Sequence, residues 1–259
     1  MFYYAGKLHH TNTIEFDITD SGWLYGANIF TTMRVYQNSL KHPLTNFQKH
    51  LNRLKNSLKI LNWQAPNWQT LEQEVEELIL HHSVIRITIF SDGRELIFGR
   101  NFPENLIEKQ TKGVQGLVCL DSQLQRVLPL HKTGNYLTPW LALQQARNQG
   151  YQEAILTNVE QEWLETSTGN LWGYKKGIWY TPDLSVGILP GVARAVIIEG
   201  ADFPIQFNHW TIEFIRDLEA IAYSNSVVEI VPFNSIICGE QKIDFDVNHP
   251  AYQSLKNLY

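Results

Sequence analysis

Lys132 is the residue of this sequence whose type and surroundings most suggest covalent chemistry. It lies near Leu130 and Tyr136 rather than in a run of charges. An amine is nucleophilic only in its neutral form, and apolar surroundings favour that form. Most lysines are nevertheless solvated surface charges. The residue type alone therefore leaves both interpretations open, and the neighbouring motifs have to decide between them.

Several short motifs occur in a fixed order along the chain. Lys132 is followed by Thr-Gly-Asn-Tyr-Leu, and Glu165 is followed by Asn170-Leu171. The other motifs are Tyr25-Gly26, Phe30-Thr31-Thr32, His50-Leu51-Asn52-Arg53-Leu54, Leu189-Pro190-Gly191-Val192-Ala193-Arg194 and Glu229-Ile230-Val231-Pro232. Together they resemble the class IV (fold-type IV) family of pyridoxal-phosphate (PLP) dependent aminotransferases. Because they span nearly the whole chain, the resemblance is more specific than a single short motif.

The resemblance implies PLP as cofactor and assigns three residues to its ring. Lys132 would form the Schiff base and act as the catalytic base. Glu165 would hold the pyridine nitrogen, since a carboxylate there favours the protonated ring. Tyr136 would lie against the O3' oxygen. The competing interpretations are a solvated turn glutamate for Glu165 and a buried aromatic without a polar role for Tyr136.

The cofactor phosphate needs a cation and backbone N–H groups. By resemblance Arg53 supplies the cation, while Gly191, Val192 and Ala193 open a helix whose N-terminus favours anions. Ser226 would add a hydroxyl. Arg53 is offset from the leucine stripe of its helix and is alternatively a charge on the solvated face. Gly191 is alternatively a simple helix start after a proline.

Residues near the substrate are indicated by the same resemblance. Arg86 lies where some relatives place an arginine near the substrate carboxyl group, although a buried arginine needs a partner and a structural pairing is the alternative. Tyr25 and Phe30 correspond to active-site wall positions, with core packing as the competing interpretation. The chain departs from the family at Ser91-Asp92-Gly93-Arg94, where an Arg-Gly pair is common. Arg94 is therefore a second candidate for the carboxylate.

Three reactions fit the family resemblance. The short chain and the Phe-Thr-Thr-Met-Arg-Val segment resemble 4-amino-4-deoxychorismate lyases, which release 4-aminobenzoate and pyruvate in folate biosynthesis. The segments Lys-Thr-Gly-Asn-Tyr-Leu and Ile-Leu-Pro-Gly-Val-Ala-Arg resemble branched-chain aminotransferases, and D-amino acid aminotransferases are also relatives. We expect the lyase, with an aminotransferase as the alternative and an inactive PLP-binding relative as the third. The resemblance also implies a homodimer acting on a small-molecule amino substrate.

Composition excludes several other classes. The formal net charge of -5 gives no basic footprint for nucleic acid or anionic membrane, and no apolar run is long enough to span a bilayer. Cys119 and Cys238 lack ligand spacing, which predicts free thiols in a reducing, cytoplasmic compartment. The His9-His10 and His81-His82 pairs lack carboxylates at ligand spacing, so no metal site is expected.

Hydrophobic periodicity predicts the elements that position these residues. Residues 1–105 should form a smaller N-terminal α+β domain, with Asn46 as the N-cap of a helix that carries His50 and Arg53. Polar residues with Pro103, Gly113 and Gly116 indicate an interdomain connection at 106–116. Residues 117–259 should form a larger C-terminal cofactor-binding domain of mixed β structure with helices. The expected fold class is α/β of the α+β type, in the two-domain arrangement of D-amino acid aminotransferases.

Overall fold

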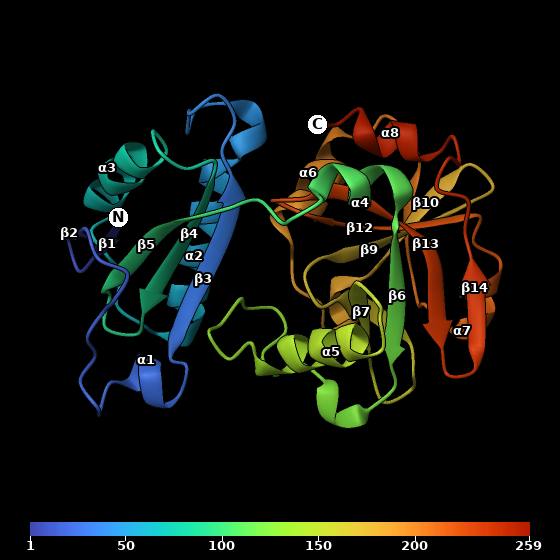
Figure 1. Ribbon diagram of the computed structural model, residues 1–259, viewed down its shortest axis with the longest axis horizontal. Coiled ribbons are helices and arrows are strands. Elements are labelled where there is room, and N and C mark those ends of the chain that lie inside the picture. The colour runs from blue at the N-terminus through green and yellow to red at the C-terminus, as the bar shows by residue number, and fades with distance from the viewer. The chain divides into compact units, whose positions relative to one another are not determined.

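An antiparallel sheet of five strands organises the first of two units in the computed structural model, which describes residues 1–259 apart from the side chain of Ser122. This unit comprises Met1–Phe102 together with His131–Asn135 (Figure 1). The strands run in the order β2-β1-β5-β4-β3. The elements of this unit are β1 (Phe2–Tyr4), β2 (Lys7–His9), α1 (Ser21–Leu24), β3 (Asn28–Arg34), the 3-10 helix η1 (Pro43–Thr45), α2 (Phe47–Leu61), α3 (Trp68–Leu78), β4 (Val84–Phe90) and β5 (Glu95–Arg100).

Helices α2 and α3 pack against this sheet because each has one apolar face. Leu51, Leu54 and Leu58 recur at helical spacing on α2 and are all buried. They join Val75 of α3 and Ile87 of β4 in one hydrophobic core. Full burial of one such side chain contributes about 1.5–3 kcal/mol, so the leucine stripe fixes the side of α2 that faces β3.

A nine-stranded mixed sheet forms the second unit, which comprises Pro103–Leu130 and Tyr136–Tyr259. Its strands are β6 (Val114–Cys119), β7 (Glu153–Thr157), β8 (Trp163–Thr166), β9 (Asn170–Lys175), β10 (Ile178–Pro182), β11 (Ile205–Asn208), β12 (Ala220–Asn225), β13 (Glu229–Cys238) and β14 (Gln241–Asp244). Its helices are α4 (Leu106–Lys112), η2 (Ser122–Leu124), α5 (Leu137–Asn148), η3 (Leu184–Val186), α6 (Val192–Gly200), α7 (Ile212–Arg216) and α8 (Tyr252–Lys256).

Part of this second sheet closes on itself. The strand order is β11-β10-β9-β12-β13-β6-β7-β8, and β8 also pairs with β9 through Glu165 and Asn170. Strand β6 runs parallel to β7 and β13, whereas β12 is antiparallel to β9 and β13. The closed ring places Glu165 and the Asn170 motif opposite each other on neighbouring strands.

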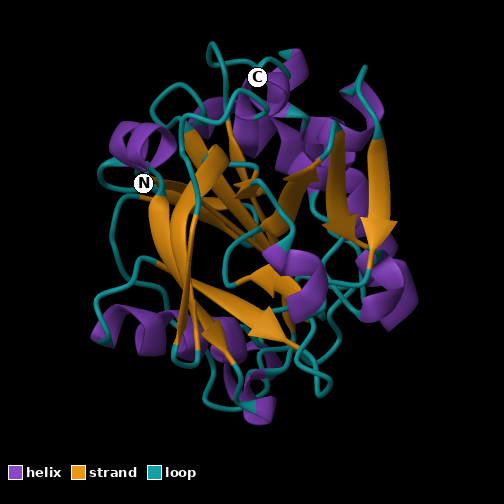
Figure 2. Cartoon of the chain, turned by 90° about the vertical axis from the view of Figure 1, so that its right-hand side faces the viewer, coloured by secondary structure: helices purple, strands orange, loops and turns teal.

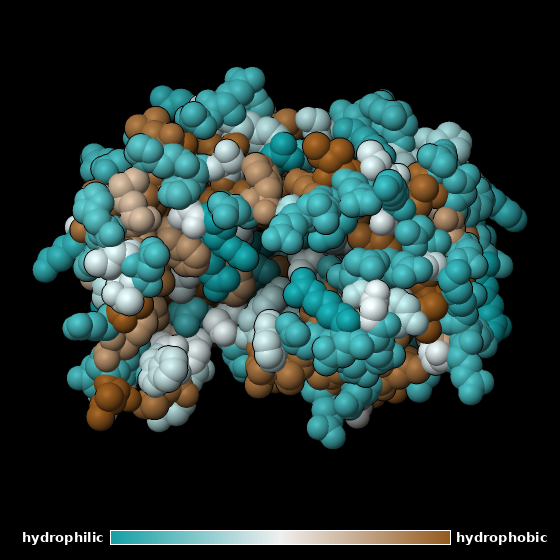
Figure 3. Space-filling model, in the orientation of Figure 1, coloured by the Kyte–Doolittle hydropathy of each residue, from teal (hydrophilic) through white to brown (hydrophobic). Residues whose placement is uncertain are grey.

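Figure 2 shows the helices and the strands of the chain in separate colours. Helix α5 buries Ala142 and Ala146 against strands β6 and β7. On the face shown in Figure 3, hydrophilic side chains predominate and hydrophobic ones lie in small groups between them. Among the described residues, no helix combines the length and the apolar character needed to cross a bilayer. The predicted class, mixed α/β with sheets and helices, is confirmed.

Two local expectations differ from the structure. Residues 106–116, expected as a connection, contain α4 and the start of β6, and the N-terminal stretch of the first unit ends at Phe102. Helix α4 packs on β13 despite its polar sequence. Asn46 does not cap α2 with its side chain, because it has φ 53° and its amide donates to the carbonyl oxygen of Leu44 at 3.0 Å.

Candidate active site

The segment His131–Asn135 carries Lys132 and pairs with β3 in the first unit. The Phe30 N–H donates to the Lys132 carbonyl oxygen at 2.8 Å, and the Gly134 N–H donates to the Asn28 carbonyl oxygen at 2.7 Å. Between them, Ile29 and Thr133 form an isolated β-bridge. A Cβ atom at position 134 would collide with the Asn28 side chain, so glycine allows this close approach. The backbone on both sides of Lys132 is therefore fixed to the edge of β3.

The side chain of Lys132 is half-buried beside an aromatic ring. Its Nζ lies 4.8 Å from the centre of the Phe30 ring, and Phe30 is only 4% exposed. The guanidinium carbon of Arg86 lies 3.6 Å from the centre of the same ring. Sequence motifs therefore identified three residues that meet at one place. Phe30 is both a core residue and a contact of the candidate catalytic lysine, so its two interpretations are compatible.

Helix α2 presents buried polar side chains on the side that faces β3 and the lysine segment. Arg53 donates from Nη2 to the hydroxyl of Thr31 at 2.7 Å, and that hydroxyl lies 2.6 Å from Nδ1 of His50. One turn further along, the Ser57 hydroxyl lies 3.0 Å from Nδ1 of His131, the residue before the lysine. Arg53 is half-buried and so is not a charge on the solvated face of α2.

Tyr25 and Arg94 differ from the other substrate-side candidates. Tyr25 is 77% exposed, so it is not a core residue of its unit. Arg94 forms ion pairs with Asp20 and, at 2.6 Å, with Asp92. Asp20 accepts from the Gly22 N–H at 2.8 Å and thereby caps α1. Arg94 thus has a structural role in holding the segment that leads to Tyr25.

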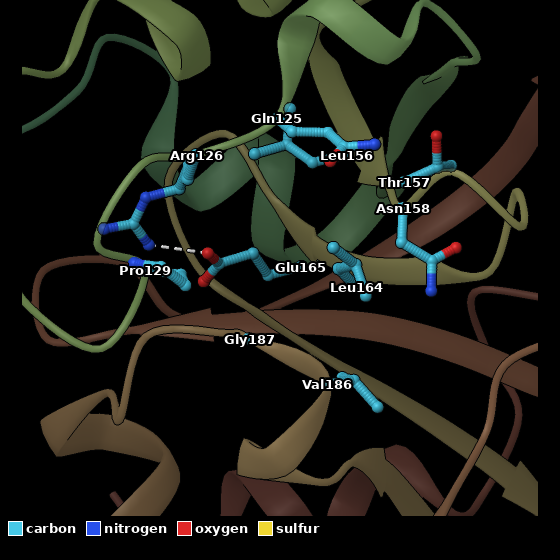
Figure 4. Close-up of a pocket in the computed structure, with 10 residues that line it drawn as sticks. All are labelled: Gln125, Arg126, Pro129, Leu156, Thr157, Asn158, Leu164, Glu165, Val186 and Gly187. Atoms are coloured by element: carbon cyan, nitrogen blue, oxygen red, sulfur yellow. Dashed lines mark hydrogen bonds and ion pairs between the residues drawn. The ribbon is translucent and has the colours of Figure 1, made fainter.

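In the second unit, Glu165 is a buried residue of β8 and not a solvated turn residue. It is 4% exposed, and its Oε1 lies 2.6 Å from Nη1 of Arg126 (Figure 4). Its Oε2 accepts from the Leu189 N–H at 3.2 Å. Both residues line a cavity of about 200 Å³ that also includes Gln125 and Asn158. A buried carboxylate needs such partners, because an unpaired buried charge is strongly unfavourable.

Tyr136 has a polar contact and is not a purely apolar core residue. It stands at the N-terminus of α5, and its hydroxyl donates to the carbonyl oxygen of Ser167 at 3.0 Å. The guanidinium carbon of Arg126 lies 5.8 Å from the centre of its ring. Arg126 therefore contacts both Glu165 and Tyr136, the two residues that the family resemblance assigns to one cofactor ring.

Gly191 forms the N-cap of α6, and among the described residues no side chain caps this helix. The N–H groups of its first turn lack helical partners, and together with the helix dipole they favour an anion. A Cβ atom at position 191 would collide with Oδ1 of Asn170, whose amide donates to the Leu189 carbonyl oxygen at 2.9 Å. Ser226 lies half-buried in the turn between β12 and β13.

Sequence reasoning missed two partners of the predicted residues. His50 was noted beside Arg53 but given no role, although a spacing of three residues places both on one side of a helix. The sequence around Arg126 gives no indication of its role, because its partner Glu165 lies much further along the chain, in β8. Among the described residues, no group of three or more His, Cys, Asp or Glu side chains has an arrangement that could hold a metal ion.

Comparisons with known proteins identify the family of this chain. The class IV amino-transferase model matches residues 28–236. Most of the chain is matched, so it belongs to the class IV aminotransferase family, and the predicted family is confirmed. Members are PLP-dependent lyases and aminotransferases, and the chain is an enzyme of one of these two kinds.

Individual relatives include both kinds of enzyme. The chain is 26% identical to aminodeoxychorismate lyase of Vibrio harveyi, over 92% of this chain and 94% of that protein. It is also 26% identical to a branched-chain-amino-acid aminotransferase of Salmonella typhimurium, over 82% of this chain and 77% of that protein. The structure of a candidate 4-amino-4-deoxychorismate lyase from Legionella pneumophila aligns with a TM-score of 0.79 at 26% identity, covering 95% of each chain. This likeness confirms the predicted fold type.

The residues of both units suit the chemistry of PLP. In the second unit, the glycine cap of α6 leaves its first turn open to a phosphate, and Glu165 offers carboxylate oxygens for a protonated ring nitrogen. In the first unit, Arg53 and Lys132 offer a guanidinium and an amine. These are the donor and acceptor types that an aromatic aldehyde with a phosphate requires.

Proposed function

We propose that this chain is a PLP-dependent 4-amino-4-deoxychorismate lyase that releases 4-aminobenzoate and pyruvate in folate biosynthesis. The observation that carries the proposal is the match to the Vibrio harveyi lyase, which covers 92% of this chain and 94% of that enzyme. The match to the Salmonella typhimurium aminotransferase covers 77% of that longer enzyme. Of these two relatives, the lyase is therefore the one that the chain matches more fully.

Each residue that was predicted to bind the cofactor would have its own role in holding it. Lys132 would bind PLP covalently, and Glu165, paired with Arg126 at 2.6 Å, would accept a hydrogen bond from the ring nitrogen. Tyr136 would face the O3' oxygen. Arg53, the first turn of α6 (Gly191, Val192 and Ala193) and Ser226 would hold the phosphate. When bound, PLP supplies an electron sink that stabilises negative charge on the substrate carbon next to the amine.

The chain's own residues would move the protons of the reaction. The Lys132 amine, in its neutral form, takes the proton from the substrate carbon that carries the amino group. The bond to the enolpyruvyl oxygen then breaks, the ring becomes aromatic, and the proton held by Lys132 passes to the departing group, which leaves as pyruvate. Arg86 binds a substrate carboxylate, while Tyr25 and Phe30 form the wall of the substrate pocket.

A class IV aminotransferase is the second candidate. The branched-chain relatives and the segments Lys132–Leu137 and Ile188–Arg194 favour it. In that reaction Lys132 would also hold the proton taken from the substrate, but no carbon–oxygen bond would break, and PLP would supply the electron sink for amino transfer. The groups that surround the substrate decide between the two outcomes, since the step in which Lys132 takes the proton is common to both.

We further propose that the enzyme is a cytoplasmic homodimer. Ile18, Trp23 and Tyr25 are 84%, 71% and 77% exposed within one short segment of the first unit. Such exposed apolar groups favour association with another chain. Cys119 and Cys238 are free, which suits a reducing compartment. Sedimentation equilibrium of wild type and Trp23→Ser tests the dimer, and a monomeric wild type would contradict it.

The proposed function is tested by spectroscopy and product analysis together. Wild type and Lys132→Ala are mixed with PLP, and the absorption band of the lysine-bound cofactor should appear only in wild type. The enzyme is then given 4-amino-4-deoxychorismate, and fluorescence of 4-aminobenzoate is followed. A parallel assay with leucine and 2-oxoglutarate measures glutamate. Release of 4-aminobenzoate supports the lyase, glutamate alone makes the enzyme an aminotransferase, and absence of the band in wild type rejects both.

A further inference from the structure

Three buried side chains of the first unit form a short hydrogen-bonded row. His50 and Thr31 are 1% and 0% exposed. The Thr31 Oγ1 atom lies 2.6 Å from Nδ1 of His50 and 2.7 Å from Nη2 of Arg53. Thr31 belongs to β3, while the other two residues lie on α2 at a spacing that puts them on one side of the helix.

The direction of each hydrogen bond in this row follows from the chemistry of its members. A guanidinium can only donate, so the Thr31 oxygen accepts from Arg53. In the part of the chain that the structure describes, the second partner of the Thr31 hydroxyl is Nδ1 of His50. The single hydroxyl proton is therefore donated to Nδ1. His50 must then carry its proton on Nε2, which defines one neutral tautomer.

The charges around His50 favour the same neutral form. Burial lowers the pKa of His50 well below its usual value, and the cations of Arg53 and Lys132 lower it further. A protonated His50 would also lose its acceptor at Nδ1 and would face two positive charges in a buried site. The row therefore has one stable arrangement of protons at neutral pH.

We propose that His50 is a positioning residue, which orients the Thr31 hydroxyl so that its oxygen holds the Arg53 guanidinium in place for the cofactor phosphate. The inference rests on the proposed function, because it takes the phosphate of PLP as the anion that Arg53 binds. Arginine has several rotatable bonds, and fixing them before the ligand arrives reduces the entropic cost of binding. Thr31 and His50 perform that fixing, because Thr31 accepts from the guanidinium and donates to Nδ1 of His50.

Paired ligands with and without a phosphate test this role. Dissociation constants for PLP and for pyridoxal are measured by absorbance with wild type, Thr31→Val and Thr31→Ser. Valine keeps the shape of threonine but has no hydroxyl, so we expect about a fivefold to tenfold loss of PLP affinity with pyridoxal binding unchanged. Serine keeps the hydroxyl and should restore PLP affinity. Equal PLP-to-pyridoxal ratios in wild type and Thr31→Val would overturn the inference alone, whereas a wild type that does not bind PLP would overturn the proposed function as well.

The tautomer of His50 gives a second readout that does not depend on activity. Long-range proton–nitrogen NMR of the histidine-labelled protein distinguishes a protonated ring nitrogen from an unprotonated one. We expect an unprotonated Nδ1 and a protonated Nε2, unchanged between about pH 6 and about pH 8 although a free histidine titrates there. Thr31→Val should shift the Nδ1 resonance, and Thr31→Ser should not. A proton on Nδ1, or titration in this range, contradicts the proposed arrangement.

Discussion

The guanidinium of Arg126 lies 2.6 Å from Oε1 of Glu165, and both side chains are buried. The pair joins the loop before the lysine segment to strand β8 of the closed ring. Leu189, two residues before the glycine cap of α6, donates its N–H to the other carboxylate oxygen. Glu165 is thus fixed from two directions.

Removing the cation from this pair should cost both stability and cofactor binding. Arg126→Met leaves a buried carboxylate without its charged partner, which typically destabilises a protein by about 3–5 kcal/mol. Without the guanidinium, Glu165 also loses a side chain that fixes its orientation, so it would hold a protonated ring nitrogen less well. Chemical denaturation and PLP titration measure the two effects. Arg147→Met, an exposed arginine on α5, is the control, and equal behaviour of both variants would contradict the role of Arg126.

Glu74 should make the stability of the first unit depend on pH. It is 5% exposed, and among the described residues neither of its oxygens has a hydrogen-bond partner. Burial, followed by the nearby charge of Glu95, raises the pKa of Glu74 to about 7. Because the folded pKa exceeds that of the unfolded chain, the free energy of unfolding falls as the pH rises from about 4.5 to about 7.

Replacing the carboxyl group of Glu74 by an amide should remove this loss of stability at higher pH. Glu74→Gln should raise the free energy of unfolding at about pH 8 by roughly 1–3 kcal/mol and change it little at about pH 5. Urea denaturation at both values of pH measures the difference. Glu76→Gln, an exposed neighbour on the same helix, should show no such dependence. A stability gain of the same size at both values of pH would show that ionisation is not its cause.

A side chain at position 191 should disturb the start of α6. A Cβ atom there would collide with the Asn170 side chain, so Gly191→Ala has to move that buried side chain, which donates to the Leu189 carbonyl oxygen at 2.9 Å. We expect a loss of about 1–3 kcal/mol in unfolding free energy together with weaker PLP binding. Gly200→Ala is the matched control, because its Cβ atom would meet only Leu258 at 3.4 Å. An unchanged PLP affinity in Gly191→Ala would contradict a phosphate site at this helix.

Substitutions of Arg86 and of Arg94 should have different effects, the first on the KM for the substrate and the second on thermal stability. Arg86→Gln should raise the KM for the amino substrate at least about tenfold, because it removes a charged hydrogen bond to a carboxylate. Arg94→Gln should instead lower the melting temperature, since Arg94 pairs with Asp20 and Asp92. Steady-state kinetics gives the KM of both variants, and thermal denaturation gives their melting temperatures. If Arg94→Gln raises KM at unchanged stability, the two assignments are reversed.

The sequence was sufficient for features that depend on local patterns. The leucine stripe of α2 predicted a helix with one buried side, which the structure confirms. The motif around Lys132 led to the correct family. These patterns are visible because helical and strand periodicity are properties of neighbouring residues.

Features that depend on long-range pairing were not predictable in this way. Arg126 and Glu165 are brought together only when the loop after η2 folds against β8, and nothing near Arg126 in the sequence indicates its partner. Asn46 has the residue type of an N-cap, but the preceding 3-10 helix sets its backbone to the left-handed region. Residues 106–116 have the composition of a linker, yet Leu106 packs against the core of the second unit.

The assignment of His131–Asn135 to the first unit means that the chain is not modular in the usual sense. A single cut after Phe102 would not yield two self-sufficient fragments. The N-terminal fragment would lose Lys132 and leave the outer edge of β3 exposed, with the Phe30 N–H and the Asn28 carbonyl oxygen unpaired. The C-terminal fragment would carry the lysine on a short stretch of backbone that had lost its pairing strand. Recombination between relatives at this boundary should therefore succeed only when strand β3 and the lysine segment come from the same parent.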